Sequence, residues 1–331
     1  MTFNFKDVYV EETSTIAGPY EKKGPLNFYF DKTYDNFYNG EKTLEQAEVK
    51  FLKESIKKVL SKSKKQIKDI DLIIGGDLLN QITSSSYGVK DYNVPFLGIY
   101  GACSTSTEGI AIASAFIDDK RIKNAIVSVS SHNLSSEKQF RNPTEYGSSK
   151  PDTATFTATG GASILLSNKK TSVKVESATI GKISNAYVKD PFNMGAVMAI
   201  AAADTINQHL KDTKRNPDYY DLILTGDLGI YGKEILKDVL KQEYKIDISK
   251  NYNDCGIMLY NLKEQKKVKA GGSGPVCSAL VVYSYILEKM KKKEFKKVLF
   301  VATGAMFSPT FVFQKQDILS TAHAISLEVV K

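Results

Sequence analysis

The chain has little cysteine and histidine and no tryptophan, and these shortages exclude several classes of protein. Its three cysteines, Cys103, Cys255 and Cys277, are too few for a disulfide framework, and their spacing is not that of a zinc site. We therefore expect a reduced, intracellular protein. Nucleic-acid binding is not expected, because tryptophan, a basic helix with base-reading spacing and an RNA-binding motif are all missing from the sequence.

The sequence also has no long apolar run. Residues 1–12 lack the basic segment and the apolar stretch of a signal peptide. Two long uncharged runs, residues 270–287 and 298–314, contain glycine, serine and proline and are not apolar spans that could cross a bilayer. We expect no transmembrane segment and, at most, a peripheral contact with a membrane.

The overall composition is that of a globular protein, with 42% hydrophobic and 25% charged residues among 331. The formal net charge is +8, and lysines gather at residues 62–65, 266–269 and 289–293. Such clusters are typical of a solvated surface. Binding of an anionic ligand or an anionic membrane surface stays open.

The most informative feature is an internal repeat. Residues 60–78 (LSKSKKQIKDIDLIIGGDL) and 210–228 (LKDTKRNPDYYDLILTGDL) align without gaps. Each copy predicts an amphipathic helix, a polar turn and a short apolar strand that stops at Gly-Asp. The identical pairs are Leu60/Leu210, Lys64/Lys214, Asp71/Asp221, Leu72/Leu222, Ile73/Ile223, Gly76/Gly226, Asp77/Asp227 and Leu78/Leu228.

The similarity between the halves continues downstream of these segments. Continuous apolar strands that alternate with helices predict sheets covered on both faces. The sequence therefore predicts one α/β domain over residues 1–331, made of duplicated halves at about 1–180 and 181–331. The further elements are glycine-bearing turns leading into helices at 101–117 and 271–287, strands at 125–130 and 298–303, strands at 161–167 and 322–330, and a linking strand at 173–182.

Cys103 is the strongest candidate for a functional side chain. A strand is predicted to end at Tyr100, the turn Gly101-Ala102 follows, and Cys103 then begins a helix, as in a nucleophile elbow. The N–H groups and the dipole at a helix start lower the pKa of a thiol and attract anions. The alternative is a small buried cysteine with no chemistry.

The string GACSTS at residues 101–106, followed by a helix of small residues, resembles the nucleophile motif of the thiolase superfamily, which includes thiolases and ketoacyl synthases. This resemblance implies a five-layered αβαβα fold built from two duplicated halves, in a protein that is usually dimeric. The internal repeat supports the same fold independently.

Longer strings carry a closer resemblance: KKGPL (22–26), GGDLLNQ (75–81), YGACSTS (100–106), SSHN (130–133), QFRNPTEYG (139–147), AAADTI (201–206), DLILTGDL (221–228), NDCG (253–256), AGGSG (270–274) and VATGA (301–305). They resemble the stage V sporulation protein AD family of spore-forming bacteria. The resemblance implies binding of dipicolinic acid (pyridine-2,6-dicarboxylic acid), free or as its calcium chelate, and no resident cofactor. It also implies dipicolinate uptake into the developing spore, a link to germination, other stage V A membrane proteins as partners, peripheral association with the spore inner membrane, and a homodimer.

Thiolase-type chemistry needs a base or a donor from the second half in addition to the thiolate. In ketosynthases a histidine follows the first strand of that half, and a histidine or asparagine lies in the next glycine-rich turn. The corresponding residues here, about 226–227 and 271–274, include neither. Of the few histidines, His209 is expected at a surface or groove position and His132 at the sheet edge where ligand sites gather. We therefore expect a binding protein and not an enzyme, with Cys103 as a vestigial nucleophile.

Two helix starts are predicted to form a cradle for the two carboxylates of the ligand. One is the turn at Cys103 and Ser104, and the other is the turn Gly272-Ser273-Gly274, whose glycines allow close approach of the backbone. Cys103→Ala is accordingly expected to weaken binding less than replacement of these glycines.

Four further residues are candidates for the site. His132 is expected to donate to a carboxylate or to stack on the ring. Arg141 is a candidate carboxylate partner, although a surface ion pair with Glu137 or Glu145 is equally open.

Asp254 and Cys255 precede a predicted hairpin. Either they form an ordinary turn, or Asp254 lies beside the pocket, where it would suit a calcium chelate. Asp77 and Asp227 are expected to cap strand ends and not to contact ligand.

Three functions stay open at this point. The first is a non-catalytic dipicolinate-binding protein that works with a membrane complex. The second is a thiolase- or ketosynthase-type acyltransferase that uses Cys103. The third is a structural partner with a vestigial pocket. The missing second-half histidine separates the first from the second, and ligand binding separates the first from the third.

Overall fold

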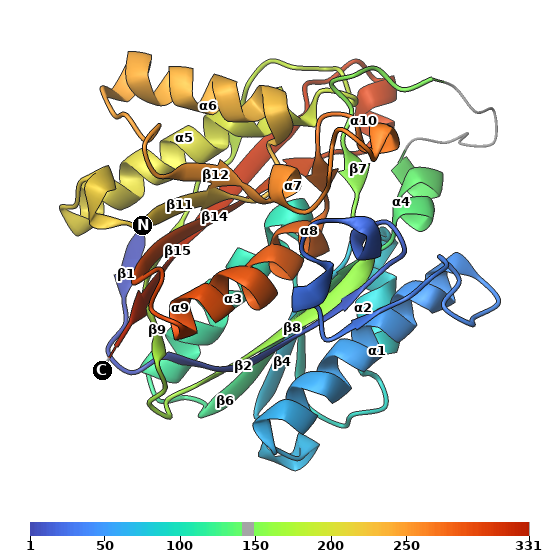
Figure 1. The fold of residues 1–331 in the computed structure, drawn as a ribbon, viewed down its shortest axis with the longest axis vertical. Coiled ribbons are helices and arrows are strands. Elements are labelled where there is room, and N and C mark those ends of the chain that lie inside the picture. Colours follow the sequence, from blue (N-terminus) through green and yellow to red (C-terminus); the bar gives the residue numbers. More distant parts are fainter. Residues whose placement is uncertain (141–148, 331) are drawn as a thin grey trace.

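Among the described residues, thirteen strands form one hydrogen-bonded sheet, and a single pair of residues joins its two parts, the first sheet and the second sheet, which form the body of the protein (Figure 1). The computed structural model describes residues 1–140 and 149–330. The strands of the first sheet lie in the order β5 (Phe96–Gly98), β4 (Leu72–Gly76), β6 (Asn124–Ser131), β8 (Gly160–Ser167) and β2 (Tyr9–Ala17). Those of the second sheet lie in the order β12 (Tyr252–Asp254), β11 (Leu222–Thr225), β14 (Lys297–Met306), β15 (Leu319–Val329) and β9 (Val173–Ile180).

The two sheets have the same topology, as the repeat predicts. β4 pairs in parallel with β5 and β6, and β11 pairs in parallel with β12 and β14. Antiparallel pairs then continue each sheet through β8 to β2 and through β15 to β9. The sheets touch where Tyr9 of β2 pairs with Lys174 of β9. The strand expected to link the halves, β9, therefore begins the second sheet as β2 begins the first.

Short strands extend these sheets at their margins. A separate parallel pair, β7 (Phe156–Thr157) with β13 (Gly272–Ser273), ties the first half of the chain to the second. The additional edge strands are β1 (Thr2–Asn4) on β9, β3 (Lys32–Thr33) on β2 and β10 (Ser184–Asn185) on β15.

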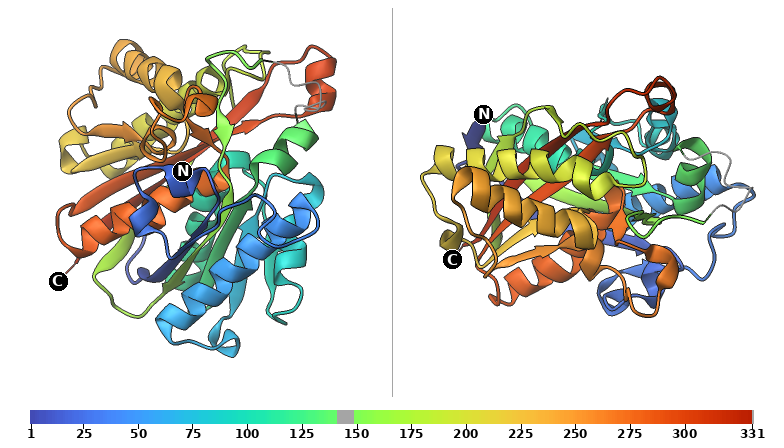
Figure 2. Two further views of the ribbon diagram at one scale, coloured as in Figure 1. Left: turned by 45° about the vertical axis from the view of Figure 1, so that its right-hand side comes forward. Right: turned by 90° about the horizontal axis from the view of Figure 1, so that it is seen from above.

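Helices cover the outer faces of both sheets and fill the space between them. On the outer face of the first sheet lie α1 (Leu44–Ser63) and α2 (Thr83–Val89). On that of the second lie α5 (Met194–Thr213) and α6 (Gly229–Tyr244), side by side (Figure 2). The central layer holds α3 (Thr105–Asp118), which contacts strands of both sheets, and the run α8 (Pro275–Leu280), the π-helix η9 (Val281–Ile286) and α9 (Leu287–Lys291). This order confirms the five-layered αβαβα fold.

The main core lies between the two sheets. Apolar side chains from the central helix α3 and from the inner strands of both halves form one buried cluster there, among them Ile110, Val127, Ile164, Phe300 and Ile325. Because the inner faces of both sheets are covered by the same helices, the two halves share a single hydrophobic interior.

Two identical pairs of the repeat, Lys64/Lys214 and Asp71/Asp221, have the same structural role in both halves. Lys64 and Lys214 end α1 and α5 in the left-handed conformation, with φ of 57° and 54°. Asp71 accepts hydrogen bonds from two backbone N–H groups at the start of β6, and Asp221 accepts from two at the start of β14. These repeated residues therefore end the helix and align the neighbouring strands in each half.

The segment after Cys255 differs from the expected hairpin. It forms α7 (Cys255–Met258), a loop and a 3-10 turn at Lys266–Val268. Leu259 and Tyr260 of this segment are buried in the main core, and the helix and the 3-10 turn take the place of the two paired strands of the predicted hairpin. The remaining helices are α4 (Asn133–Phe140) and α10 (Pro309–Phe313). Within residues 1–140 and 149–330, no helix combines the length and the apolar character needed to span a membrane.

Candidate functional site

Cys103 lies in the turn between β5 and α3. This turn is a 3-10 helix, Ala102–Ser104, and Ala102 has a left-handed backbone with φ of 50°. A Cβ added to Gly304 of β14 would lie 2.1 Å from the Gly101 carbonyl oxygen. Glycine at position 304 therefore lets the turn approach the second sheet, and this brings Cys103 to the boundary between the halves. The strand–turn–helix arrangement predicted around Cys103 is present.

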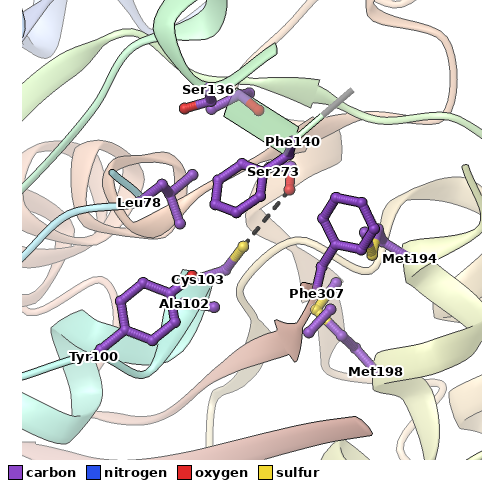
Figure 3. A pocket seen from close by; sticks show the side chains of 12 residues that line it. Leu78, Tyr100, Ala102, Cys103, Ser136, Phe140, Met194, Met198, Ser273 and Phe307 are labelled. Atoms are coloured by element: carbon purple, nitrogen blue, oxygen red, sulfur yellow. Dashed lines mark hydrogen bonds between the residues drawn. The ribbon is translucent and has the colours of Figure 1, made fainter. Parts of the chain in front are cut away.

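A pocket opens beside Cys103 (Figure 3). It contains about 480 Å³ of space, including its open mouth. Aromatic side chains form much of its wall, and the rings of Phe140 and Phe307 lie 5.6 Å apart. Among the described residues, no charged side chain lines it. The lining residues are Leu78, Tyr100, Ala102, Cys103, Ser136, Phe140, Thr157, Met194, Met198, Ser273, Ala305 and Phe307.

The inner end of the pocket rests on a buried carboxylate, Asp227. Cys103 Sγ lies 3.6 Å from Ser273 Oγ, the contact that is dashed in Figure 3. Ser273 Oγ donates to Asp227 Oδ2 (3.1 Å), and Thr303 Oγ donates to Oδ1 (2.8 Å). The Gly274 N–H also donates to Oδ2 (3.2 Å). Three donors thus converge on Asp227, and the Cys103 thiol reaches this carboxyl group through Ser273.

These contacts keep the thiol neutral. Burial raises the pKa of Cys103 well above its ordinary value, and the charge of Asp227 raises it further. Burial also raises the pKa of Asp227 to about 7, and Asp254 adds to this shift, although the hydrogen bonds from the hydroxyls oppose it. The expectation that the helix start lowers the pKa of Cys103 is therefore wrong, because burial and a neighbouring carboxylate outweigh the helix dipole.

Asp227 can contact Cys103 because Asp254 performs the capping role in the second half. In the first half, Asp77 accepts from two backbone N–H groups, one in the turn after β4 and one in α2. In the second half, the two N–H groups at the start of α6 donate to Asp254 instead. The prediction that both repeat aspartates act as caps is correct for Asp77 and wrong for Asp227.

The donors of the predicted cradle are already used within the protein. The Ser104 N–H and hydroxyl both bond to the Gly101 carbonyl oxygen, and the Ser104 side chain is fully buried. The Gly274 N–H is used by Asp227. The cradle of free N–H groups is therefore wrong at both of these positions.

The glycines of the second turn serve packing and not ligand approach. An added Cβ at Gly272 would lie 2.8 Å from Cys277 Sγ, and one at Gly274 would lie 2.9 Å from Ser131 Oγ. Both contacts are with protein atoms. Of this turn, Ser273 lines the pocket.

His132 and His209 are both buried away from the pocket. The His132 Nε2–H donates to the Phe37 carbonyl oxygen (2.9 Å), because the N-terminal loop folds over it. His209 lies between the hydroxyl groups of Thr179 and Tyr220. Burial lowers the pKa of each histidine to about 4, so both are neutral at pH 7. The expected ligand role of His132 and the expected surface position of His209 are wrong.

Two other predicted residues, Asp254 and Cys255, also lie away from the pocket. Asp254 and Cys255 are fully buried at the end of β12, where the Thr225 hydroxyl donates to Asp254 (2.7 Å), and neither residue lines the pocket. Arg141 lies outside the described residues, directly after Phe140. From the predicted set, the structure brings together Cys103 and Ser273.

Asp227 and the aromatic walls are the features that sequence reasoning missed. A signal for Asp227 was present, because the second half has two aspartates, Asp227 and Asp254, near strand ends where one cap is needed. Phe140 lies in the string QFRNPTEYG, of which only Arg141 is a candidate from the sequence, and Phe307 lies two residues after the string VATGA.

Comparisons with known proteins agree along almost the whole chain. The model of the family described as Stage V sporulation protein AD matches residues 1–328. The Stage V sporulation protein AD of Bacillus subtilis (strain 168) is 46% identical over 321 residues, which cover 97% of this chain and 94% of that relative.

Solved structures of thiolase-like enzymes share the fold. One is 3-oxoacyl-[acyl-carrier-protein] synthase III from Aquifex aeolicus VF5, with a TM-score of 0.56, 12% identity and coverage of 97% of this chain and 99% of that one. Another is cerulenin-bound OleA from Xanthomonas campestris, with a TM-score of 0.60, 14% identity and coverage of 98% and 100%. At such identities the likeness concerns the fold alone.

Proposed function

This chain belongs to the stage V sporulation protein AD family, and from this premise we propose that its Cys103 pocket binds dipicolinate (pyridine-2,6-dicarboxylate) during spore formation. In this proposal the protein is a binding component of dipicolinate uptake into the developing spore. It has no catalytic step of its own. The ligand enters free or as its calcium chelate.

The neutral thiol in an aromatic pocket is the observation that carries the proposal. Tyr100, Phe140 and Phe307 provide flat apolar surfaces that suit a planar pyridine ring. Cys103 is held as a neutral thiol beside Ser273, with its pKa raised by burial and by Asp227, and is not a thiolate, the form that attacks a thioester. Asp227 stands after the first parallel strand of the second half, where ketosynthases carry a histidine donor. A pocket of this chemistry favours binding over acyl transfer.

The second candidate function is acyl transfer through Cys103. It is favoured by one observation, the contacts that lead from the half-buried thiol through Ser273 to a carboxyl group whose pKa is about 7, which is a group able to accept the thiol proton. Intact-mass spectrometry after incubation with an acyl thioester separates the two functions. We expect no acyl adduct on Cys103, and a stable adduct would favour the second candidate.

Isothermal titration of dipicolinate into the purified protein tests the proposal. We expect saturable binding that is lost with the 2,4-dicarboxylate isomer, whose carboxylates are placed differently around the ring. Phe307→Ala should weaken binding about tenfold, because it removes one aromatic wall. Phe313→Ala is the matched control, since Phe313 is 78% exposed in α10 and does not line the pocket. Absence of binding, or equal effects of the two variants, would contradict the proposal.

The proposal includes partners. We place the protein peripherally at the spore inner membrane with other stage V A membrane proteins, and as a homodimer. The dimer is supported by β5, which lies at the edge of the first sheet with Leu97 partly exposed. Light scattering should give twice the monomer mass for the wild type and the monomer mass for Leu97→Lys.

A further inference from the structure

With Asp227 ionised, the inner end of the pocket offers acceptors. The hydroxyl hydrogen of Ser273 points to Asp227 Oδ2, so in its 3.6 Å contact with Ser273 Oγ the Cys103 thiol is the donor. Both side chains therefore present lone pairs to the pocket. The Gly274 N–H and the Thr303 hydroxyl are used by the same carboxylate. A ligand carboxylate that reaches this point meets oxygen and sulfur lone pairs, with a buried negative charge behind them.

Among residues 1–140 and 149–330, no lysine, arginine or histidine forms a hydrogen bond or an ion pair with Asp227. Asp227 is 1% exposed. The neighbouring titratable groups whose pKa values interact with that of Asp227 are Asp254 from β12, Cys255 from α7, Cys277 from α8 and Cys103. Lys233 of α6 bonds to Asn253 and acts on Asp254 instead. An anion that enters the pocket therefore adds its charge to a site that already carries one.

We propose that Asp227 determines the charge of the ligand that the pocket accepts: a carboxylate reaches Cys103 and Ser273 only together with one proton or one bound cation. This inference rests on the proposed dipicolinate binding and adds a specificity-determining residue to it.

The proton taken up with free dipicolinate binds to Asp227. When solvent supplies one proton to Asp227 Oδ2, that oxygen becomes a donor, and its O–H turns to Ser273 Oγ. The Ser273 hydroxyl hydrogen is released from Asp227 and turns to the ligand carboxylate. The proton leaves a hydronium ion or a buffer acid and forms the new O–H bond, so the pocket gains the two negative charges of free dipicolinate and one positive charge. The pKa of Asp227, about 7 in the empty pocket, makes this uptake accessible near neutral pH.

The calcium chelate needs no such proton, because calcium cancels both carboxylate charges before the ligand enters. The two ligand forms therefore differ in their response to pH. Above pH 7 the affinity for free dipicolinate should fall about tenfold per pH unit, while the affinity for the chelate stays nearly constant.

Calorimetry in two buffers of different ionisation enthalpy, PIPES and Tris at pH 7.5, counts the protons taken up with the ligand. We expect about three-quarters of a proton per free dipicolinate in the wild type, because Asp227 with a pKa of about 7 is already about one-quarter protonated at pH 7.5, and close to none with the preformed calcium chelate. Asp227→Asn should take up none with either form, because the amide does not titrate. Asp77→Asn is the matched control, since Asp77 is the buried repeat equivalent, accepts from the backbone N–H groups of Leu79 and Ser85, and does not contact Cys103 or Ser273. It should behave as the wild type does.

Different experimental results would overturn the role of Asp227 and the proposed function. Proton uptake that persists in Asp227→Asn, or free dipicolinate that binds the wild type with no uptake and no dependence on pH, would overturn the role of Asp227 and leave binding intact. If neither ligand form binds the wild type, the proposed function itself is wrong. The wild-type pH comparison of the two forms needs no variant, so poor folding of Asp227→Asn does not remove the test.

Discussion

Asp77 and Asp227 hold the same place in the two halves but have different partners. Asp77 accepts hydrogen bonds from backbone N–H groups that follow β4. Asp227 instead accepts from the side chains of Ser273 and Thr303, and it contacts the thiol of Cys103. The duplication thus preserved the carboxylate in both halves, while the surroundings of one copy turned it toward the pocket.

The reactivity of Cys103 tests this placement. Asp227→Asn removes a charge that raises the pKa of the thiol, so the pKa should fall, and alkylation by iodoacetamide at pH 8 should become about tenfold faster for a fall of one unit. Peptide mass spectrometry measures the rate at each cysteine. Cys255 and Cys277 are fully buried and serve as internal controls that should stay unmodified.

An unchanged rate at Cys103 would show that Asp227 does not control the thiol. Modification of the two buried cysteines would instead indicate that the variant has lost its packing, and circular dichroism of the same sample separates this outcome from a true effect.

Prediction of the site from sequence succeeded where a local pattern fixes the geometry. The turn at Cys103 and the turn at Ser273 each have glycines and a following helix, and the duplicated topology brings them together. It failed for His132, because the loop that buries this ring comes from residues far away in sequence, around Phe37. It also failed for the aromatic walls, which come from three separate segments whose meeting depends on tertiary packing.

At the scale of elements, Asp254 connects β12, β11 and the start of α6. Its carboxylate accepts from the Thr225 hydroxyl (2.7 Å) and from the N–H groups of Leu228 and Gly229 (2.9 and 3.0 Å). These donors are buried, and they have no water to turn to if the carboxylate is removed. The residue is therefore a cap of the second sheet and helix and not part of the pocket wall.

Asp254→Ala should accordingly destabilise the fold. We expect the free energy of unfolding in urea to fall by about 3 kcal/mol or more. Each buried donor without an acceptor costs about 1–3 kcal/mol, and this change leaves three buried donors without their acceptor. Dipicolinate affinity of the folded fraction should stay within about threefold of the wild type. Loss of affinity with unchanged stability would instead place Asp254 in the binding site.

The turn before α8 depends on Gly274. Its φ of +94° disfavours any residue with a Cβ, and the added atom would lie 2.9 Å from Ser131 Oγ and 3.1 Å from Thr157 Cγ2. Gly274→Ala should therefore lower the free energy of unfolding by about 2–3 kcal/mol, from backbone strain and overlap together. Gly40→Ala controls for strain alone, because Gly40 has φ of +81° and its nearest neighbour is 3.5 Å away. Equal losses in the two variants would show that the overlap is unimportant.

At the scale of the whole molecule, the repeat was sufficient to predict the architecture. Two copies of helix, strand, turn-helix, strand and strand can bury their apolar faces together only in covered sheets, and the structure has this arrangement in both halves. The boundary between the sheets was harder to predict from the sequence, because β9 is continuous in sequence with the first half but pairs with β15 in the second. Strand partners depend on contacts that no local pattern encodes.

Buried ionisable groups make the stability of the whole protein depend on pH. Burial raises the pKa of Glu21 to about 7, that of Glu48 to about 8, where Asp77 adds, and that of Asp227 to about 7. The folded state therefore holds more protons than the unfolded state between about pH 4 and pH 8, and its stability falls as pH rises through this window.

The three histidines make the stability of the protein rise with pH, over a lower pH range. Burial lowers their pKa values to about 4, so their contribution rises from pH 4 and is complete by about pH 6.5. Above pH 6.5 the carboxyl groups dominate. We expect the free energy of unfolding in urea to fall by roughly 1–3 kcal/mol from pH 6.5 to pH 8, and by less in Glu48→Gln. A constant or rising value over this range would contradict the assignment of these groups as buried and protonated.

The most direct test of the central claim, that the Cys103 pocket is the dipicolinate site, is the rate of iodoacetamide alkylation at Cys103 with and without saturating ligand. The thiol is half-buried and opens into the pocket, so a bound ring must cover it. We predict at least tenfold protection by dipicolinate and none by the 2,4-dicarboxylate isomer at the same concentration. If dipicolinate binds with full occupancy and Cys103 reacts at its original rate, the ligand lies elsewhere on the protein and this account of the site is wrong.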